Sequence, residues 1–218
     1  MSKIIYKLLR SFMKLLKTIQ NIDELSTIIW NKEIFGTDVY HLVAAFIMYS
    51  VLGWLVESIY MSICERKIVN RGFGKGPFCP IYGFGAVIGY IILSPLAGHY
   101  FYLYITGAVL ATIFEFLVGK LMIKCLGDLW WDYNEKPFNY KGIICLESTL
   151  AWGVYALIII GFLNNKIVDT IDKADMNTGE KFCIVILLVV VVDYMFRFYH
   201  IYRDKQQKKM MSDVEADS

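Results

Sequence analysis

Residues 81–118 read IYGFGAVIGYIILSPLAGHYFYLYITGAVLATIFEFLV and contain a single charged residue, Glu115. A membrane-spanning α-helix needs about 20 mostly apolar residues, so this run is too long for one span. The segment Ser94-Pro95-Leu96-Ala97-Gly98 interrupts it, because Pro and Gly break helices. The run therefore predicts a helical hairpin in a membrane, with arms at residues 81–96 and 99–122.

Three further apolar windows lie outside this hairpin, at residues 39–63, 143–163 and 182–202. Of the 218 residues, 57% are hydrophobic and only 19% are charged, against about a quarter charged in soluble domains. This composition excludes disordered, collagenous and small disulfide-stapled proteins, and the net charge of +2 leaves no nucleic-acid footprint. We predict an all-α membrane protein with about five transmembrane helices, preceded by a basic amphipathic N-terminal helix.

The N-terminal helix is expected because basic residues recur every three or four positions from Lys3 to Lys17, while apolar residues fill the other face. The segment lacks the uncharged core and the cleavage site of a signal peptide. It predicts either a helix in the headgroup plane or a solvated helix docked on the membrane domain. The predicted organisation is an amphipathic N-terminal region at 1–38, a polytopic membrane domain at 39–203 and a charged cytoplasmic tail at 204–218.

Lys and Arg gather near alternate ends of the predicted spans. They follow the first span, flank the connection between the third and fourth spans, and follow the fifth, whereas the loop after Pro95 has none. Cytoplasmic loops are enriched in Lys and Arg, so these segments and the C-terminus are predicted to be cytoplasmic in a multi-pass protein of the cell membrane. The basic N-terminal helix then lies on the opposite side, either as an exception or because residues 22–35 re-enter the bilayer.

Acidic residues within the predicted spans are candidates for function. An ionised side chain at membrane depth costs about 2.5–3.5 kcal/mol on insertion scales, so each requires a partner or a task. Small residues recur at fourfold spacing around Glu115, at Gly107, Ala111 and Gly119, so that a neighbouring backbone can approach beside the carboxylate. The acids concerned are Glu57, Glu115, Glu147 and Asp193.

These acids also have structural interpretations. Glu57 and Glu147 lie near span ends, where a carboxylate can reach water or pair with Arg71 or Lys141. Asp193 can pair with Arg197, four residues along the same helix. Glu57, Glu115 and Glu147 alternatively face one shared interior.

The stretch NRGFGKGPFCPIYGFG at residues 70–85 has five Gly and two Pro, which forbid a continuous helix. Irregular backbone at membrane depth is tolerated where it is buried in protein or lines a cavity, and its free amides can bind an ion or a headgroup. Arg71 and Lys75 would then favour an anion. A tight structural turn is the alternative, and the order of a Walker A loop is absent, because Gly76 follows Lys75.

The stretch WWDY at residues 130–133, followed by PFN at 137–139, is typical of an interfacial aromatic belt with a turn. Alternatively, Asp132 and Asn139 complete a site with Arg71.

The Cys and His residues form no metal or nucleophile signature. The 5 Cys contain no C-x-x-C pair, and the 3 His have no metal-binding spacing. We expect packing roles for both, and we predict no cofactor and no metal. An enzyme is disfavoured, because neither an ATPase motif nor a nucleophile accompanies the carboxylates.

Taken together, the motifs are similar to those of a bacterial family of type IV ABC-transporter permeases, over about residues 42–160. One departure is Lys141-Gly142-Ile143, where the family's pattern has a Gly-Arg pair. The resemblance implies a polytopic permease without an ATPase of its own, hence a separate ATPase subunit and dimerisation. The segments that carry it are GWLVE at 53–57, NRG at 70–72, GPFCPIYG at 76–83, Glu115, WDY at 131–133, PFN at 137–139 and Gly142.

We therefore predict a transport component that handles a polar or ionic substrate, with membrane lipids, an ATPase subunit and a second copy of the chain as partners. Two alternatives stay open: a non-catalytic scaffold or sensor, and an intramembrane enzyme with a carboxylate base acting on a lipid-linked substrate. The predicted pathway residues are Glu57, Asn70, Arg71, Glu115, Asp132, Asn139 and Glu147.

Overall fold

The computed structural model describes residues 24–216, so the predicted basic helix within residues 1–20 lies outside the described residues. The chain divides into two units, one ending at Val43 and one beginning at Ala44. In the first unit, residues 24–30 are helical, and β1 (Glu33–Ile34) pairs antiparallel with β2 (Thr37–Asp38). These elements lie within residues 22–35 and just after them, where the sequence suggests, as one alternative, a segment that re-enters the bilayer.

The second unit is helical, which confirms the predicted fold class. Among the described residues, four helices are long and apolar enough to cross a membrane. A fifth apolar segment, Pro80–Leu96, is shorter and comprises α3 and a terminal 3-10 turn. The helices are α2 (Val39–Glu65), α3 (Pro80–Leu93), α4 (Tyr100–Leu126), α5 (Leu146–Ile158), α6 (Asn164–Asp172) and α7 (Met176–Ala216), with a π-helical turn, η2 (Ile159–Leu163), between α5 and α6.

The fourth span differs from the predicted window of 143–163. It runs from Leu146 to Asp172, so most of the stretch between the predicted windows 143–163 and 182–202 is helical, and only residues 173–175 separate α6 from α7. The reason is amphipathic periodicity in α6: Asn164, Ile167 and Ile171 are buried on one face, and the charged residues occupy the other. The charged residues of this segment lower its mean hydropathy and so suggest a loop, but they lie on the exposed side of a helix.

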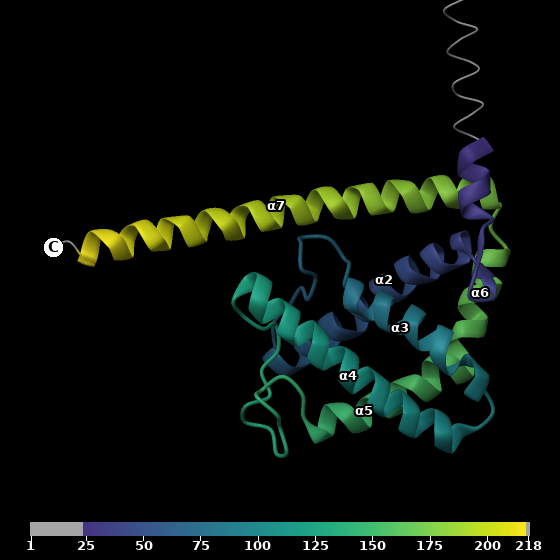
Figure 1. Ribbon diagram of the computed structural model, residues 1–218, viewed down its shortest axis with the longest axis horizontal. Coiled ribbons are helices and arrows are strands. Elements are labelled where there is room, and N and C mark those ends of the chain that lie inside the picture. The colour runs from purple at the N-terminus through teal and green to yellow at the C-terminus, as the bar shows by residue number, and fades with distance from the viewer. Residues whose placement is uncertain (1–23, 217–218) are drawn as a thin grey trace, which may run out of the picture. The chain divides into compact units, whose positions relative to one another are not determined.

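α4 and α5 pack against each other along much of their length, and they lie side by side in Figure 1. Gly107 of α4 faces Ala156 of α5 without room for a side chain, as the stripe of small residues predicts. Thr112 Oγ1 donates a hydrogen bond to Thr149 Oγ1 at 3.0 Å across the pair. Leu103 and Ile160 are buried in the adjoining core cluster, which also includes Leu93 of α3.

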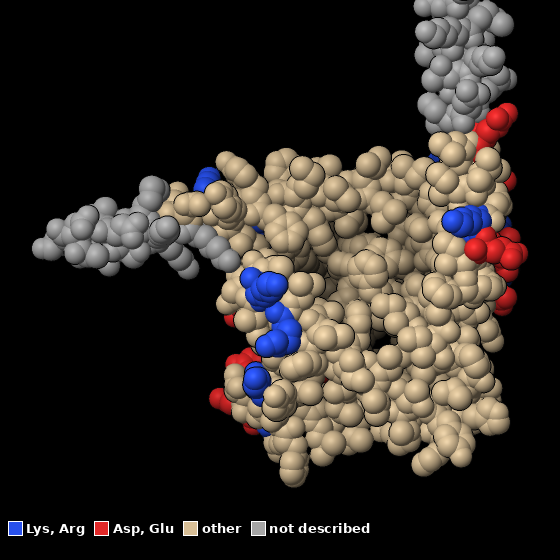
Figure 2. Space-filling view, in the orientation of Figure 1, with Lys and Arg blue, Asp and Glu red and all other residues tan. Residues whose placement is uncertain are grey.

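Large apolar side chains cover much of the exterior, as expected for helices that meet lipid. In Figure 2, Lys and Arg gather around the C-terminal end of α4 and the loop after it, while the middle of the face is uncharged. Two loops lie between the helices near the candidate site: the Gly-rich loop, residues 66–79, and the Trp-Asp-Tyr loop, residues 127–145.

Candidate functional site

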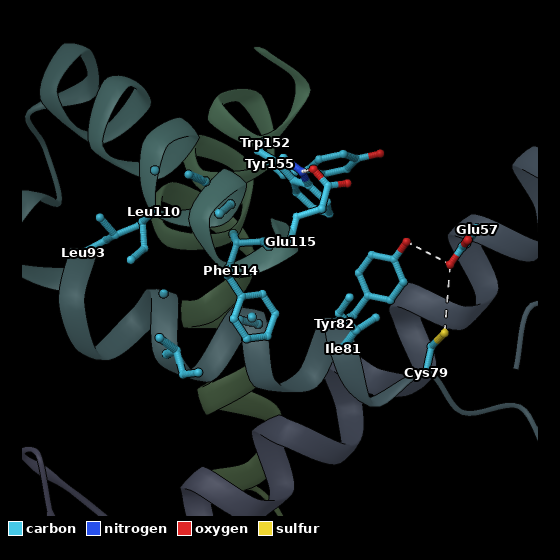
Figure 3. Close-up of a pocket in the computed structure, with 18 of the residues that line it drawn as sticks. Glu57, Cys79, Ile81, Tyr82, Leu93, Leu110, Phe114, Glu115, Trp152 and Tyr155 are labelled. Carbon is cyan, nitrogen blue, oxygen red and sulfur yellow. Dashed lines mark hydrogen bonds between the residues drawn. The ribbon is translucent and has the colours of Figure 1, made fainter. Parts of the chain in front are cut away.

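A cavity of about 170 Å³ lies among α2, α3, α4 and α5 and the two loops. One end is polar and contains Glu57, Arg71 and Glu115, which are the Asp, Glu, Lys and Arg side chains that line it among residues 24–216. The other end is apolar and reaches Leu93 and Ile160. Figure 3 shows this polarity: Glu57 lies with Tyr82 and Cys79 at one side, and Leu93 and Leu110 lie at the other.

Glu57 and Arg71 form an ion pair at the polar end. Arg71 Nε lies 2.8 Å from Glu57 Oε1, and each side chain is 22% exposed. Tyr82 donates its hydroxyl to Glu57 Oε2 at 2.9 Å, and Arg71 Nη2 donates to the carbonyl oxygen of Trp130 at 3.0 Å. The pair therefore joins α2, α3 and both loops, and two sides of the guanidinium are occupied by protein acceptors.

Cys79 lies beside this pair, immediately before α3. Its side chain is buried and directed toward the Glu57 carboxylate and the Arg71 carbonyl oxygen, with Sγ 3.4 Å from the latter. Burial, followed by the negative charge of Glu57, raises the pKa of the Cys79 thiol to about 12. The thiol is therefore protonated at neutral pH and is a weak nucleophile there.

The Gly-rich loop is held from two sides. Asn70 Oδ1 accepts hydrogen bonds from Trp54 Nε1 at 2.7 Å and from the Gly72 amide at 2.9 Å. Asp193 of α7 accepts the amides of Lys75 and Gly76 at 3.1 and 3.0 Å. These two amides, which the sequence suggests for an anion, are therefore bound by a carboxylate of the chain itself.

Glu115 is the most deeply buried acid of the site, at 4% exposed. Trp152 Nε1 donates to Oε2 at 3.0 Å, Ser148 Oγ lies 3.2 Å from the same oxygen, and Tyr133 donates its hydroxyl to Oε1 at 3.1 Å. All three are neutral groups, and no ion pair to Glu115 occurs among the described residues. The protein thus satisfies the hydrogen bonds of this carboxylate without supplying a countercharge.

Local structure explains how these donors reach Glu115. Ser148 forms a capping box with Cys145 at the start of α5, and Trp152 lies one turn further along the same helix. Tyr133 is fixed because its amide donates to the Gly142 carbonyl oxygen at 3.0 Å inside the Trp-Asp-Tyr loop. Burial, followed by the Glu115 charge and its hydrogen bond, raises the pKa of the Tyr133 hydroxyl, which keeps it a donor.

The structure brings Glu57, Arg71 and Glu115 to one cavity, but Asn70, Asp132, Asn139 and Glu147 are not among the lining residues. Asp132 accepts the amide of Asn134, and Asn139 donates to the carbonyl oxygens of Asn134 and Lys136, so both shape the Trp-Asp-Tyr loop.

Glu147 pairs with Lys136 rather than with Lys141. The Nζ to Oε2 distance is 2.8 Å, and the two side chains are 64% and 48% exposed. The hydrogen bond and the charge of Glu147 raise the pKa of Lys136. A role for Asn70, Asp132, Asn139 and Glu147 in a substrate pathway stays a prediction.

Sequence reasoning missed Tyr82 and Tyr133 as partners of the two carboxylates. It also missed the role of Asp193, which binds a loop 117 and 118 positions away in the chain. A weak signal existed for Tyr82, because the Tyr lies in the least regular stretch of the sequence. The described residues contain no group of three or more His, Cys, Asp or Glu that could hold a metal ion.

Comparison with known families decides the relationship. The family model described as "Putative ABC-transporter type IV" matches residues 44–198. The chain belongs to this family. The match spans the complete cavity wall, from Glu57 to Ile160, and also α7 up to Phe198. It confirms the resemblance carried by the Gly-rich and Trp-Asp-Tyr motifs. No curated protein and no solved structure matches the chain.

Proposed function

We propose that the chain is the membrane subunit of a transporter and that its substrate occupies the cavity lined by Glu57, Arg71 and Glu115. The observation that carries this proposal is the cavity itself, in which an ion pair and a buried carboxylate lie beside an apolar compartment. A purely structural carboxylate would be expected to pair within the helices rather than face a space. Family membership supports transport as the class of activity.

The sequence contains no Walker A loop, so ATP hydrolysis would come from a separate subunit. We place the Gly-rich and Trp-Asp-Tyr loops and the C-terminus on the cytoplasmic side, since Lys and Arg concentrate there. An ATPase docked on these loops would lie next to the polar end of the cavity. The backbone links from Arg71 to Trp130 and from Asp193 to the Gly-rich loop offer a route for coupling.

The test starts from the full chain, tagged and purified in mild detergent from the membranes of its own host. We expect a P-loop ATPase at fixed stoichiometry, and ATP hydrolysis by the complex after reconstitution into nanodiscs. The Glu115→Gln variant should change the hydrolysis rate, whereas Glu65→Gln, at an exposed carboxylate paired with Lys67, should leave it unchanged. Absence of an associated ATPase, together with no ATP-dependent uptake into inside-out vesicles, would refute the proposal.

A further inference from the structure

The polar end of the cavity holds two carboxyl groups, Glu57 and Glu115, and one guanidinium, Arg71. Glu57 and Arg71 neutralise each other at 2.8 Å, and Glu115 contributes a further carboxylate that is held by neutral donors alone. A carboxylate offers about four acceptor positions, and Tyr133, Trp152 and the Ser148 hydroxyl, which also lies 3.0 Å from the Cys145 carbonyl oxygen, leave at least one of them open. The polar end therefore carries one acidic group that has no basic partner among the described residues and that a cationic ligand can pair with.

An anionic ligand finds few free donors at this end. The guanidinium of Arg71 already donates to Glu57 and to the Trp130 carbonyl oxygen, which takes up two of its five N–H groups and places the Glu57 carboxylate beside any anion that would bind there. The amides of Lys75 and Gly76 are occupied by Asp193. The side chain of Lys75 is not among the lining residues.

Aromatic rings surround the polar end. Trp131 and Tyr133 come from the Trp-Asp-Tyr loop, and Trp152 and Tyr155 come from α5, where their rings lie 5.6 Å apart at 50°. Figure 3 shows Trp152 and Tyr155 next to Glu115, with Phe114 below them. Aromatic faces attract organic cations, and the attraction grows when water is removed.

An apolar compartment continues from this aromatic wall. Along α4 the lining runs from Glu115 back to Gly107, which is eight residues, or about 12 Å at 1.5 Å per residue. Gly89 and Leu93 of α3 and Ile160 of η2 close the far end. A compartment of this length accommodates an alkyl chain rather than a second polar group.

We propose that the cavity binds a monocationic amphiphile, an amine or quaternary ammonium head attached to one apolar chain. The head would lie between Glu115 and the rings of Trp152 and Tyr155, and the chain would extend along α4 toward Leu93. The inference rests on the proposed function in one respect only, namely that the bound molecule is also the transported one.

The experiment measures binding to the full chain in nanodiscs, using the probes decyltrimethylammonium, decyl sulfate and decyl glucoside. Three of the chain's 5 Trp line the cavity, so tryptophan fluorescence reports occupancy, with empty nanodiscs correcting for partition into lipid. We expect the cation to bind at least about tenfold more tightly than either of the others, which corresponds to about 1.4 kcal/mol. Equal or tighter binding of the anion or the glucoside would overturn the proposal.

Variants separate charge from shape. Glu115→Gln keeps one acceptor oxygen for the Trp152 and Ser148 donors, and its amide can donate to the Tyr133 hydroxyl oxygen. It should weaken cation binding about tenfold without affecting the glucoside, while the control Glu65→Gln, at an exposed carboxylate paired with Lys67, should change neither. Gly89→Leu should reduce binding of all three probes, because Gly89 borders open space in the cavity. Unchanged cation affinity in folded Glu115→Gln, or in Gly89→Leu, would contradict the proposal. If the cation does not bind preferentially but the complex still hydrolyses ATP, the proposed substrate class is refuted and the proposed transporter function is not.

Discussion

The packing of α4 against α5 leads to a prediction about two glycines that both line the cavity, Gly107 of α4 and Gly89 of α3. Replacing Gly by Ala inside a helix is favourable by about 0.8–1 kcal/mol from propensity alone, and this gain is common to both sites. A Cβ at Gly89 meets nothing within 4 Å, whereas one at Gly107 collides with the Cβ of Ala156. Ala156 cannot rotate its Cβ away, so the helices would have to separate.

Overpacking of this kind costs about 1–3 kcal/mol. Because the propensity gain cancels between the two sites, Gly107→Ala should be less stable than Gly89→Ala by about 1–3 kcal/mol. The assay is reversible unfolding in mixed micelles by added sodium dodecyl sulfate, followed by circular dichroism. Gly89→Ala should match or exceed the wild type. Equal midpoints for the two variants, or a more stable Gly107→Ala, would refute the close approach of α4 and α5.

Two further predictions concern the Gly-rich loop. Since the pKa of Cys79 is raised to about 12, its alkylation by iodoacetamide at pH 8 should be much slower than that of the exposed Cys125, and Glu57→Gln should accelerate it by removing a nearby negative charge. Mass spectrometry of the labelled peptides from pH 7 to 10 measures this, and equal rates for Cys79 and Cys125 at pH 8 would contradict it. Asp193→Ala removes the acceptor of two loop amides, each hydrogen bond being worth about 0.5–1.5 kcal/mol, so amide exchange should accelerate at residues 75–76 and stay unchanged in α4. Asp193→Asn, which keeps one acceptor oxygen, should have an intermediate effect, and protection unaffected by Asp193→Ala would show that the contact does not hold the loop.

Much of the helical frame could be predicted from hydropathy and helix breakers. The hairpin at Pro95 and the first and last spans depend on runs of apolar residues, which are local properties of the chain. The Glu57 and Arg71 pair was also accessible, because a charge at a span end next to a basic loop needs a partner. Mean hydropathy could not predict that the fourth span continues as a helix from Asn164 to Asp172. The apolar residues of that segment recur on one helical face, while its average hydropathy is low.

The surroundings of Glu115 were less predictable for a different reason. Its donors come from positions 18, 33 and 37 residues further along the chain. The packing of α4 against α5 brings Ser148 and Trp152 to it, and the fold of the Trp-Asp-Tyr loop brings Tyr133. Asp193 illustrates the same limit: an Arg four residues away suggests a pair within the helix, but the carboxylate instead accepts two amides of the distant Gly-rich loop. Such contacts depend on tertiary packing and have no signature in a single sequence.

The unequal arms of the hairpin have a consequence for the surrounding lipid. Pro80–Leu96 rises only about 26 Å, less than the hydrocarbon thickness of about 30 Å, whereas Tyr100–Leu126 rises about 40 Å. Only residues 97–99 join the two arms, so the excess length of α4 falls at its C-terminal end, beside the Gly-rich loop. A bilayer that adapts to the shorter arm is thinned on that side, which is one way that hydrophobic mismatch is relieved. Beside the shorter arm, the lipid headgroups would then lie deeper, closer to Glu57 and Arg71. At the same depth, the lipid beside the longer α4 would still present acyl chains.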